Sequence, residues 1–134
     1  MEAPSLPGPM KQRTFVQKDD FTENKLGFEW NYLNNPIQSN YSLSDRNGFL
    51  RLTGNDSNLS QLPGVTFIGR RQQHFDFITT ASVEFVPKNN NEEAGITLYK
   101  EPAWHYDFTI KNVSNKRVVM VCRRWLRTRG RSII

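Results

Sequence analysis

The sequence contains little cysteine and little histidine. Cys122 is the single cysteine among 134 residues, and His74 and His105 are the two histidines. A lone cysteine excludes an internal disulfide and a multi-cysteine metal site, and the two histidines lack the spacing of a His-x-x-x-His metal motif. We therefore predict no cofactor and no metal, and a core stabilised by packing alone.

Long apolar runs are also missing. Residues 1–10 carry three prolines and no apolar stretch, so they are neither a signal peptide nor a membrane anchor. We interpret residues 1–18 as a flexible leader and predict a cytoplasmic protein with no membrane partner, although a signal removed before this numbering would make it a secreted one. No segment has the periodicity of a long amphipathic helix.

Acidic residues are absent from the end of the chain. From residue 116 onward there are seven basic residues and no acidic one, which leaves 11 bases against 13 acids in the rest. The net charge of +5 therefore arises in residues 112–134, interpreted as a basic tail of uncertain structure. Such a tail can bind nucleic acid or another anionic surface, but its abrupt change of composition favours a non-native end and argues against a nucleic-acid partner.

What the chain does contain favours an all-β domain. Its length fits one domain, and short alternating segments are separated by turn residues. The Asn47-Gly48 pair is a strong hairpin signal, and in residues 75–85 every second side chain is Phe, Thr, Ala or Val, which predicts a long strand with one buried face. The other predicted strands are residues 26–32, 41–43, 49–53, 65–68, 94–99 and 104–110. We predict an antiparallel β-sandwich of jelly-roll type.

The first candidate site is the polar run at residues 69–74, which follows a strand-like segment. If the strand continues, alternation places Arg70, Gln72 and His74 on one face, opposite Arg71 and Gln73. These side chains could form a row that faces a ligand. Equally, they could be the charged edge of a sheet, protected against pairing with other chains.

The second candidate site lies on the predicted strand at residues 104–110. Alternation places Trp104 with Tyr106 and Phe108 on one face, and His105 with Asp107 on the other. A polar row beside aromatic rings is what a sugar-binding surface requires, because rings stack on pyranose faces and polar groups bind hydroxyls. The alternative, favoured by spacing alone, is a solvated outer face of a sandwich.

The sequence gives weak grounds for catalysis within this chain. A glycosidase needs two carboxylates at a defined separation, and other hydrolases need a nucleophile beside a base. The acidic pairs at residues 19–20 and 92–93 are interpreted as surface pairs. There is no Gly-rich phosphate loop.

Several short motifs occur in a consistent order between about Asp19 and Ile110. The most specific are GFLRL at residues 48–52, RRQ at 70–72 and EEAG at 92–95. Together they resemble the C-terminal domain of family 43 glycoside hydrolases, the β-xylosidases and α-L-arabinofuranosidases. The resemblance implies a concanavalin A-like β-sandwich.

In that family the catalytic carboxylates belong to a separate five-bladed propeller, so the resemblance carries no catalytic residue over to this chain. The resemblance also implies that the sandwich packs on the propeller and can contribute a loop that helps to close the sugar pocket. Because further strands should follow Ile110 where the basic tail stands, we expect residues 19–111 to form only the first part of an incomplete sandwich.

The main hypothesis is an accessory module, or a fragment of one, from a xylan- or arabinan-degrading glycosidase. Its expected partners are a family 43 propeller and a xylo- or arabino-oligosaccharide, and the alternative is nucleic-acid or anionic-surface binding through the tail. The candidate sugar or interface residues are Arg70, Arg71, Gln72, His74, Trp104, His105 and Asp107.

Overall fold

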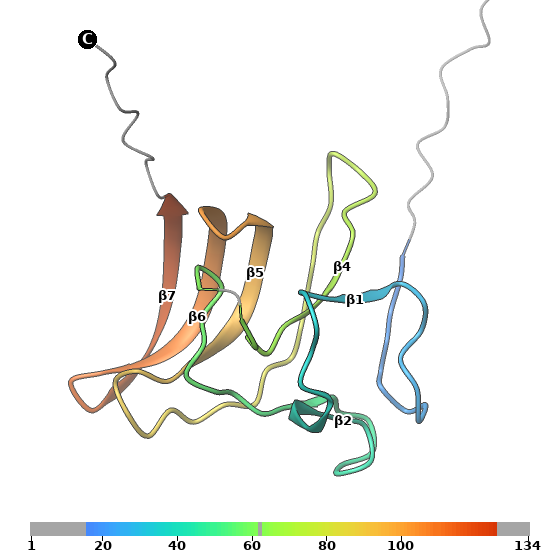
Figure 1. Cartoon of the computed structure of the whole chain (residues 1–134), viewed down its shortest axis with the longest axis horizontal. Coiled ribbons are helices and arrows are strands. Elements are labelled where there is room, and N and C mark those ends of the chain that lie inside the picture. Colours follow the sequence, from blue (N-terminus) through green and yellow to red (C-terminus); the bar gives the residue numbers. More distant parts are fainter. Residues whose placement is uncertain (1–15, 62, 126–134) are drawn as a thin grey trace, which may run out of the picture.

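A computed structural model describes residues 16–61 and 63–125, which form antiparallel strands and one short 3-10 helix (Figure 1). The elements are β1 (Trp30–Tyr32), η1 (Gln38–Asn40), β2 (Tyr41–Ser42), β3 (Arg51–Leu52), β4 (Ile68–Arg70), β5 (Glu93–Glu101), β6 (Trp104–Val113) and β7 (Lys116–Trp125). Every strand pairing is antiparallel, which confirms the all-β prediction. No helix in these residues is long and apolar enough to cross a membrane.

The strands form three sheets. The largest contains three strands in the order β5-β6-β7, while β1 pairs with β4 and β2 pairs with β3. Figure 1 shows the β5-β6-β7 sheet on one side of the molecule and the two small sheets on the other. The strand expected at residues 26–32 is shorter than predicted, since β1 begins at Trp30 and Phe28 is fully exposed.

The predicted hairpin around Asn47-Gly48 is confirmed, because β2 and β3 pair across it. The Phe49 amide donates to the Arg46 carbonyl over 3.2 Å, which closes a four-residue turn. Gly48 has a φ of 76°, as the third position of a type II turn requires. Only the glycine of the Asn-Gly pair adopts a positive φ, so the turn differs from the type I′ form that this pair often takes.

The expectation that strands stop near Lys111 is wrong. Strand β6 runs on to Val113, and β7 returns beside it along its whole length. Ser114 and Asn115, with φ of 50° and 62°, form the two-residue turn, and positive φ at both positions matches the twist of a hairpin. Residues 112–125 of the expected basic tail are therefore part of a sheet, while residues 126–134 lie outside the described part.

The long strand expected at residues 75–85 is also wrong. This stretch forms no strand and is part of a projecting loop between β4 and β5 (Figure 1). Phe75 and Ile78 are almost fully exposed, at 101% and 95%. Alternation gives a segment the capacity to form a strand, but a strand also needs a hydrogen-bonded neighbour, and none lies beside this one among the described residues.

The apolar core is small. In the described ranges Val65 is the sole buried hydrophobic residue, and half-buried aromatic rings link the small sheets. Tyr32 and Tyr41 meet edge to face with ring centroids 4.9 Å apart. The Tyr41 hydroxyl also donates to the Phe67 carbonyl and accepts from the Phe67 amide, which joins β2 to the segment leading into β4.

Candidate functional site

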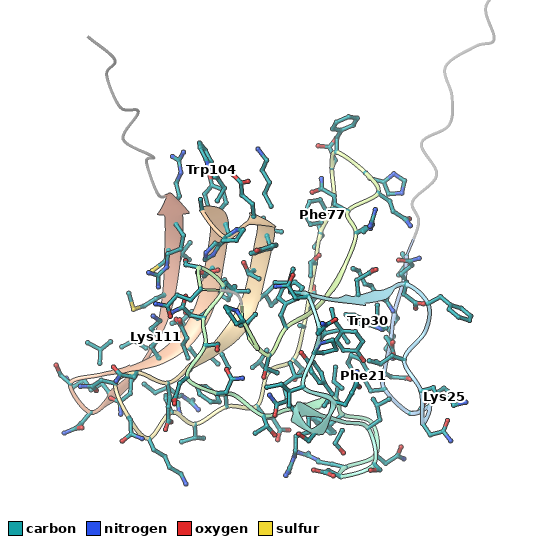
Figure 2. The ribbon with its side chains drawn as sticks, in the orientation of Figure 1. Phe21, Lys25, Trp30, Phe77, Trp104 and Lys111 are labelled. Carbon is teal, nitrogen blue, oxygen red and sulfur yellow. The ribbon has the colours of Figure 1, made fainter. Side chains whose placement is uncertain are left out.

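The first candidate site centres on Arg70, the last residue of β4, which pairs with Trp30 of β1. Its Nη2 lies 2.8 Å from Glu29 Oε1 and 3.3 Å from Asp19 Oδ2. The guanidinium carbon lies 4.3 Å from the Trp30 ring centroid. We call Asp19, Glu29, Trp30 and Arg70 the Arg70 cluster. Figure 2 shows Trp30 beside Phe21 in the interior of this half of the molecule.

Asp19 is held in its charged form. Burial raises the pKa of its carboxyl, but hydrogen bonds from the Trp30 indole and the Phe21 amide, together with the charge of Arg70, outweigh burial and lower it overall. A glycosidase general acid needs the opposite shift. Asp19 and Glu29 share the same arginine nitrogen, so this pair of carboxylates stabilises the fold rather than flanking a glycosidic bond.

The rest of the polar run does not join Arg70. Because β4 ends at Arg70, the strand alternation that would align Gln72 and His74 with it does not continue. Arg71, Gln72 and His74 are exposed, and the Gln72 side-chain amide donates to the His74 carbonyl over 2.7 Å. The predicted row is therefore divided into one interior arginine and an exposed polar stretch.

The second candidate site lies under the β5-β6-β7 sheet. His105 Nδ1 lies 2.8 Å from Asp107 Oδ1, and His105 Nε2 lies 3.3 Å from Ser60 Oγ. Asp107 Oδ2 is also 3.6 Å from Arg124 Nε on β7. His105 and Asp107 are only 3% and 6% exposed. We call Ser60, His105, Asp107 and Arg124 the His105 network.

This burial corrects the second sequence prediction. The alternation along β6 is as expected, but the polar row faces inward and the aromatic row faces solvent, with Tyr106 and Phe108 about half exposed. The polar row is neither a sugar-binding surface nor a solvated outer face. Ser60 lies against it, and the contact between Ser60 and His105 ties the segment that carries Ser60 to the sheet.

Ser60, His105 and Asp107 are connected through the two imidazole nitrogens, as the residues of a Ser-His-Asp hydrolytic triad are. Such a site needs free backbone N–H groups to bind an oxyanion. The Ser60 amide already donates to the Asn58 side chain and the Gln61 amide to the Asn58 carbonyl, both over 3.0 Å. With His105 almost fully buried, the His105 network satisfies buried polar groups and anchors the loop.

The acidic pair at residues 92–93 also has structural partners. Glu92 accepts from the Lys88 amide and the Asn89 side chain, and Glu93 pairs with Lys111. Within residues 16–61 and 63–125, no group of three His, Cys, Asp or Glu side chains is placed to hold a metal ion.

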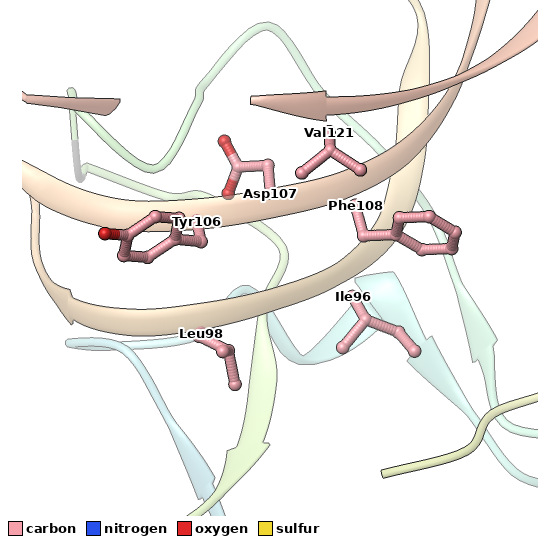
Figure 3. A pocket seen from close by; sticks show the side chains of 6 residues that line it. All are labelled: Ile96, Leu98, Tyr106, Asp107, Phe108 and Val121. Atoms are coloured by element: carbon pink, nitrogen blue, oxygen red, sulfur yellow. The ribbon is translucent and has the colours of Figure 1, made fainter. Parts of the chain in front are cut away.

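A shallow pocket lies on the solvent side of the same sheet (Figure 3). Its lining is almost entirely apolar, and Figure 3 shows the Asp107 carboxylate directed away from it. Such a lining offers few hydrogen bonds to sugar hydroxyls. The lining residues are Ile96, Leu98, Tyr106, Asp107, Phe108 and Val121.

The seven candidate residues thus lie in separate places. Arg70 is in the interior cluster, Arg71 with Gln72 and His74 is on the exposed stretch, and Trp104 lies on the opposite face of β6 from His105 and Asp107. Sequence reasoning missed Asp19, Glu29, Ser60 and Arg124. Ser60 is 45 residues from His105 and Asp19 is 51 residues from Arg70, so no local pattern could have paired them.

The antiparallel sheets define an all-β domain. A sequence profile for the β-xylosidase C-terminal concanavalin A-like domain matches residues 18–131. The chain belongs to this family, which confirms the resemblance drawn from its motifs. The match extends through β7, so the family likeness does not end near Ile110.

Two curated relatives match most of this chain but only a small part of their own length. It is 38% identical over 118 residues to the non-reducing end α-L-arabinofuranosidase BoGH43B of Bacteroides ovatus, a match covering 88% of this chain and 22% of that protein. It is 37% identical over 106 residues to a putative β-xylosidase of Escherichia coli, covering 78% and 20%.

Solved structures of family 43 proteins contain the same fold. The chain superposes on the xyloglucan-locus protein GH43B of Bacteroides ovatus with a TM-score of 0.69 and 32% identity, covering 85% of this chain and 23% of that one. For BlXynB of Bacillus licheniformis the TM-score is 0.68 at 27% identity, covering 79% and 20%. The chain therefore spans about a fifth of the length of these relatives.

Proposed function

We propose that this chain is an accessory β-sheet module of a family 43-type glycoside hydrolase and acts by packing on a catalytic propeller that degrades hemicellulose. The observation that carries the proposal is the family match over residues 18–131, set against relatives of which the chain spans only about a fifth. The described residues supply packing and buried polar networks, with no carboxylate pair arranged for glycoside hydrolysis.

The contact surface in this proposal is the exposed stretch at residues 71–78. It carries the fully exposed Phe75 and Ile78 next to Arg71, Gln72 and His74. Exposed apolar side chains rimmed by polar groups are typical of protein interfaces, and a large aromatic commonly dominates the binding energy. In Figure 1 this stretch projects from the molecule, where a partner can reach it.

The Arg70 cluster gives the projecting stretch a fixed base. Arg70 is the residue immediately before it, and its side chain is only 21% exposed and bonded to two carboxylates. A contact loop that leaves a fixed point loses less conformational entropy on binding than a loop that is loose at both ends. The role of Arg70 in binding is therefore to position the loop.

Sugar contact is the weaker part of the proposal. Burial removes His105 and Asp107 from any sugar surface, and Trp104 lies on the opposite face of its strand. The exposed amide of Gln72 and the imidazole of His74 remain as groups that can meet a sugar, at the edge of a propeller pocket.

The nucleic-acid alternative finds no support. The basic residues of β7 alternate between the two faces of the sheet instead of forming one patch, and Arg124 is engaged with Asp107. Phosphate binding needs cations gathered on one surface.

Isothermal titration calorimetry tests the proposal, with the propeller domain of a family 43 enzyme titrated into the full chain. We expect saturable heat, and Phe75→Ala should weaken binding by about tenfold or more, as for an interface aromatic. Phe28→Ala is the matched control because Phe28 is equally exposed but lies on another segment. No heat with folded chain, or equal effects of the two substitutions, would contradict the proposal.

A second titration uses xylo-oligosaccharide in place of the propeller. We expect no measurable heat with the chain alone and additional heat when the propeller is present. Tight binding of the sugar by the isolated chain would instead show a carbohydrate site of its own.

A further inference from the structure

The loop that carries the contact surface is held at both of its ends. We call residues 71–83 the exposed loop, because every residue in this range is exposed. Arg70 and its two carboxylates hold the start of the loop. In the described part of the chain, the loop forms a hydrogen bond from the Gln72 side chain to the His74 carbonyl and none to the segments around it. Its arrangement therefore depends on what holds its two ends.

The far end of the loop is held by an ion pair between Glu84 and Arg46, which are 38 residues apart in the sequence. Arg46 Nη1 lies 2.6 Å from Glu84 Oε2, and Arg46 Nη2 lies 3.3 Å from Glu84 Oε1. The planar guanidinium thus binds both carboxylate oxygens, which fixes the orientation of the two groups as well as their distance. The hydrogen bonds from Arg46 also lower the pKa of the Glu84 carboxyl, which favours its charged form.

Arg46 is itself oriented by the β2-β3 hairpin. It is the first residue of the turn, and its carbonyl accepts the hydrogen bond from the Phe49 amide that closes the turn. Its guanidinium carbon lies 3.6 Å from the centroid of the Phe49 ring, a cation–π contact that restricts an otherwise flexible side chain. Glu84 therefore meets a guanidinium that the hairpin already holds in place.

The ion pair is exposed, so its main effect is local. The side chains of Arg46 and Glu84 are 53% and 58% exposed. Ion pairs at such exposure contribute little to the stability of a fold, because solvent screens them and two long side chains must be ordered. Fixing a flexible segment at its second end, however, removes arrangements that the segment could otherwise adopt. A contact surface with fewer arrangements loses less conformational entropy when it binds.

We propose that Arg46 and Glu84 are positioning residues, whose ion pair fixes the returning end of the exposed loop and so presents its contact surface to a partner in one arrangement. This inference deepens the proposed function and rests on it, since the partner is the propeller that residues 71–78 bind. The two residues act through the loop and need no contact with the propeller of their own.

Nitrogen-15 relaxation of the full chain tests the role of the ion pair without any partner. Arg46→Ala should lower the backbone order parameters of residues 80–84 towards the values below about 0.6 of flexible backbone. Arg51→Ala is the matched control, because Arg51 lies in the same hairpin, is 61% exposed and pairs with Asp45 instead of the loop. It should leave these order parameters unchanged.

A charge swap separates the ion pair from other effects of the substitution. Arg46→Glu alone should loosen the loop, and adding Glu84→Arg to it should restore most of the order. The urea midpoint of unfolding should be the same in all of these variants, because the effect is local.

Calorimetry with the propeller domain measures the consequence for binding. Arg46→Ala should weaken the affinity by about fivefold, the double charge swap should regain most of it, and Arg51→Ala should change nothing. Equal order parameters in Arg46→Ala and Arg51→Ala overturn the inference, as does a swap that restores nothing or a loosened loop that binds as tightly as before. An unaltered chain that gives no heat contradicts the proposed function, whereas the order parameters decide the role of the ion pair in either case.

Discussion

The Arg70 cluster makes a specific prediction for the stability of the chain. Arg70→Ala removes the 2.8 Å contact to Glu29, the 3.3 Å contact to Asp19 and the stacking of the guanidinium on Trp30. It also leaves Asp19, 24% exposed, without its cation. The substitution should therefore lower the free energy of unfolding well beyond the effect of an ordinary surface change.

The size of the effect follows from the contacts. A hydrogen bond to a charged group contributes about 1.5–3 kcal/mol, and an exposed cation–π contact about 0.5–1 kcal/mol. Solvent reaches part of every member, and Glu29 is 43% exposed, so screening places the total near the lower end. We expect a loss of about 2 kcal/mol, or a fall of about 10 °C in Tm for a domain of this size.

Urea unfolding followed by tryptophan fluorescence measures the loss. Arg71→Ala is the matched control, because Arg71 is adjacent and exposed, and it should change the free energy of unfolding by less than about 0.5 kcal/mol. Arg70→Lys should recover only part of the loss, since an ammonium cannot form the planar fork and stack together. Equal effects of Arg70→Ala and Arg71→Ala would refute the account of the cluster.

Three further predictions follow from single positions. The folded-state pKa of Asp19 lies below its ordinary value of 3.8. The contribution of its carboxylate to stability is therefore complete above that pH and is lost as the pH falls through the lowered value. Asp19→Asn should remove this pH dependence, which unfolding curves at about pH 6 and about pH 3 measure. Gly95→Ala should abolish stable folding, measured by circular dichroism, whereas Gly54→Ala should be tolerated. Ser60→Ala should cost about 1 kcal/mol and speed proteolysis of the loop at residues 54–64, with Ser82→Ala as the exposed control.

Each of these has an opposite outcome that would count against it. An unchanged pH dependence in Asp19→Asn would mean that the carboxylate is not held by the cluster. A well-folded Gly95→Ala would contradict the structure, since a Cβ there meets β6 backbone atoms at under 3 Å and one at Gly54 meets nothing within 4 Å. Equal proteolysis of the two serine variants would show that the His105 network does not anchor the loop.

Local sequence patterns predicted several elements of the fold correctly. The Asn47-Gly48 turn and the alternation along β6 depend on residues close in sequence, and both appear as predicted, apart from the turn type. The family likeness was also readable, because it rests on short motifs in a fixed order.

The predictions that were wrong concern features that depend on residues far apart in the sequence. Which side of β6 is buried is decided by the loop bearing Ser60, and alternation alone cannot tell the covered face from the open one. The segment at residues 75–85 has strand periodicity but no neighbouring strand in the described structure. The basic composition after Lys116 concealed a strand that Ser114-Asn115 and the valines at 118, 119 and 121 could have indicated.

The most direct test of the accessory role is hydrogen–deuterium exchange of the full chain, with and without a saturating family 43 propeller domain. The account predicts that amides in residues 71–78, which exchange freely in the chain alone, become protected in the complex, while the β5-β6-β7 sheet changes little. Unchanged exchange in residues 71–78 at saturation would contradict it.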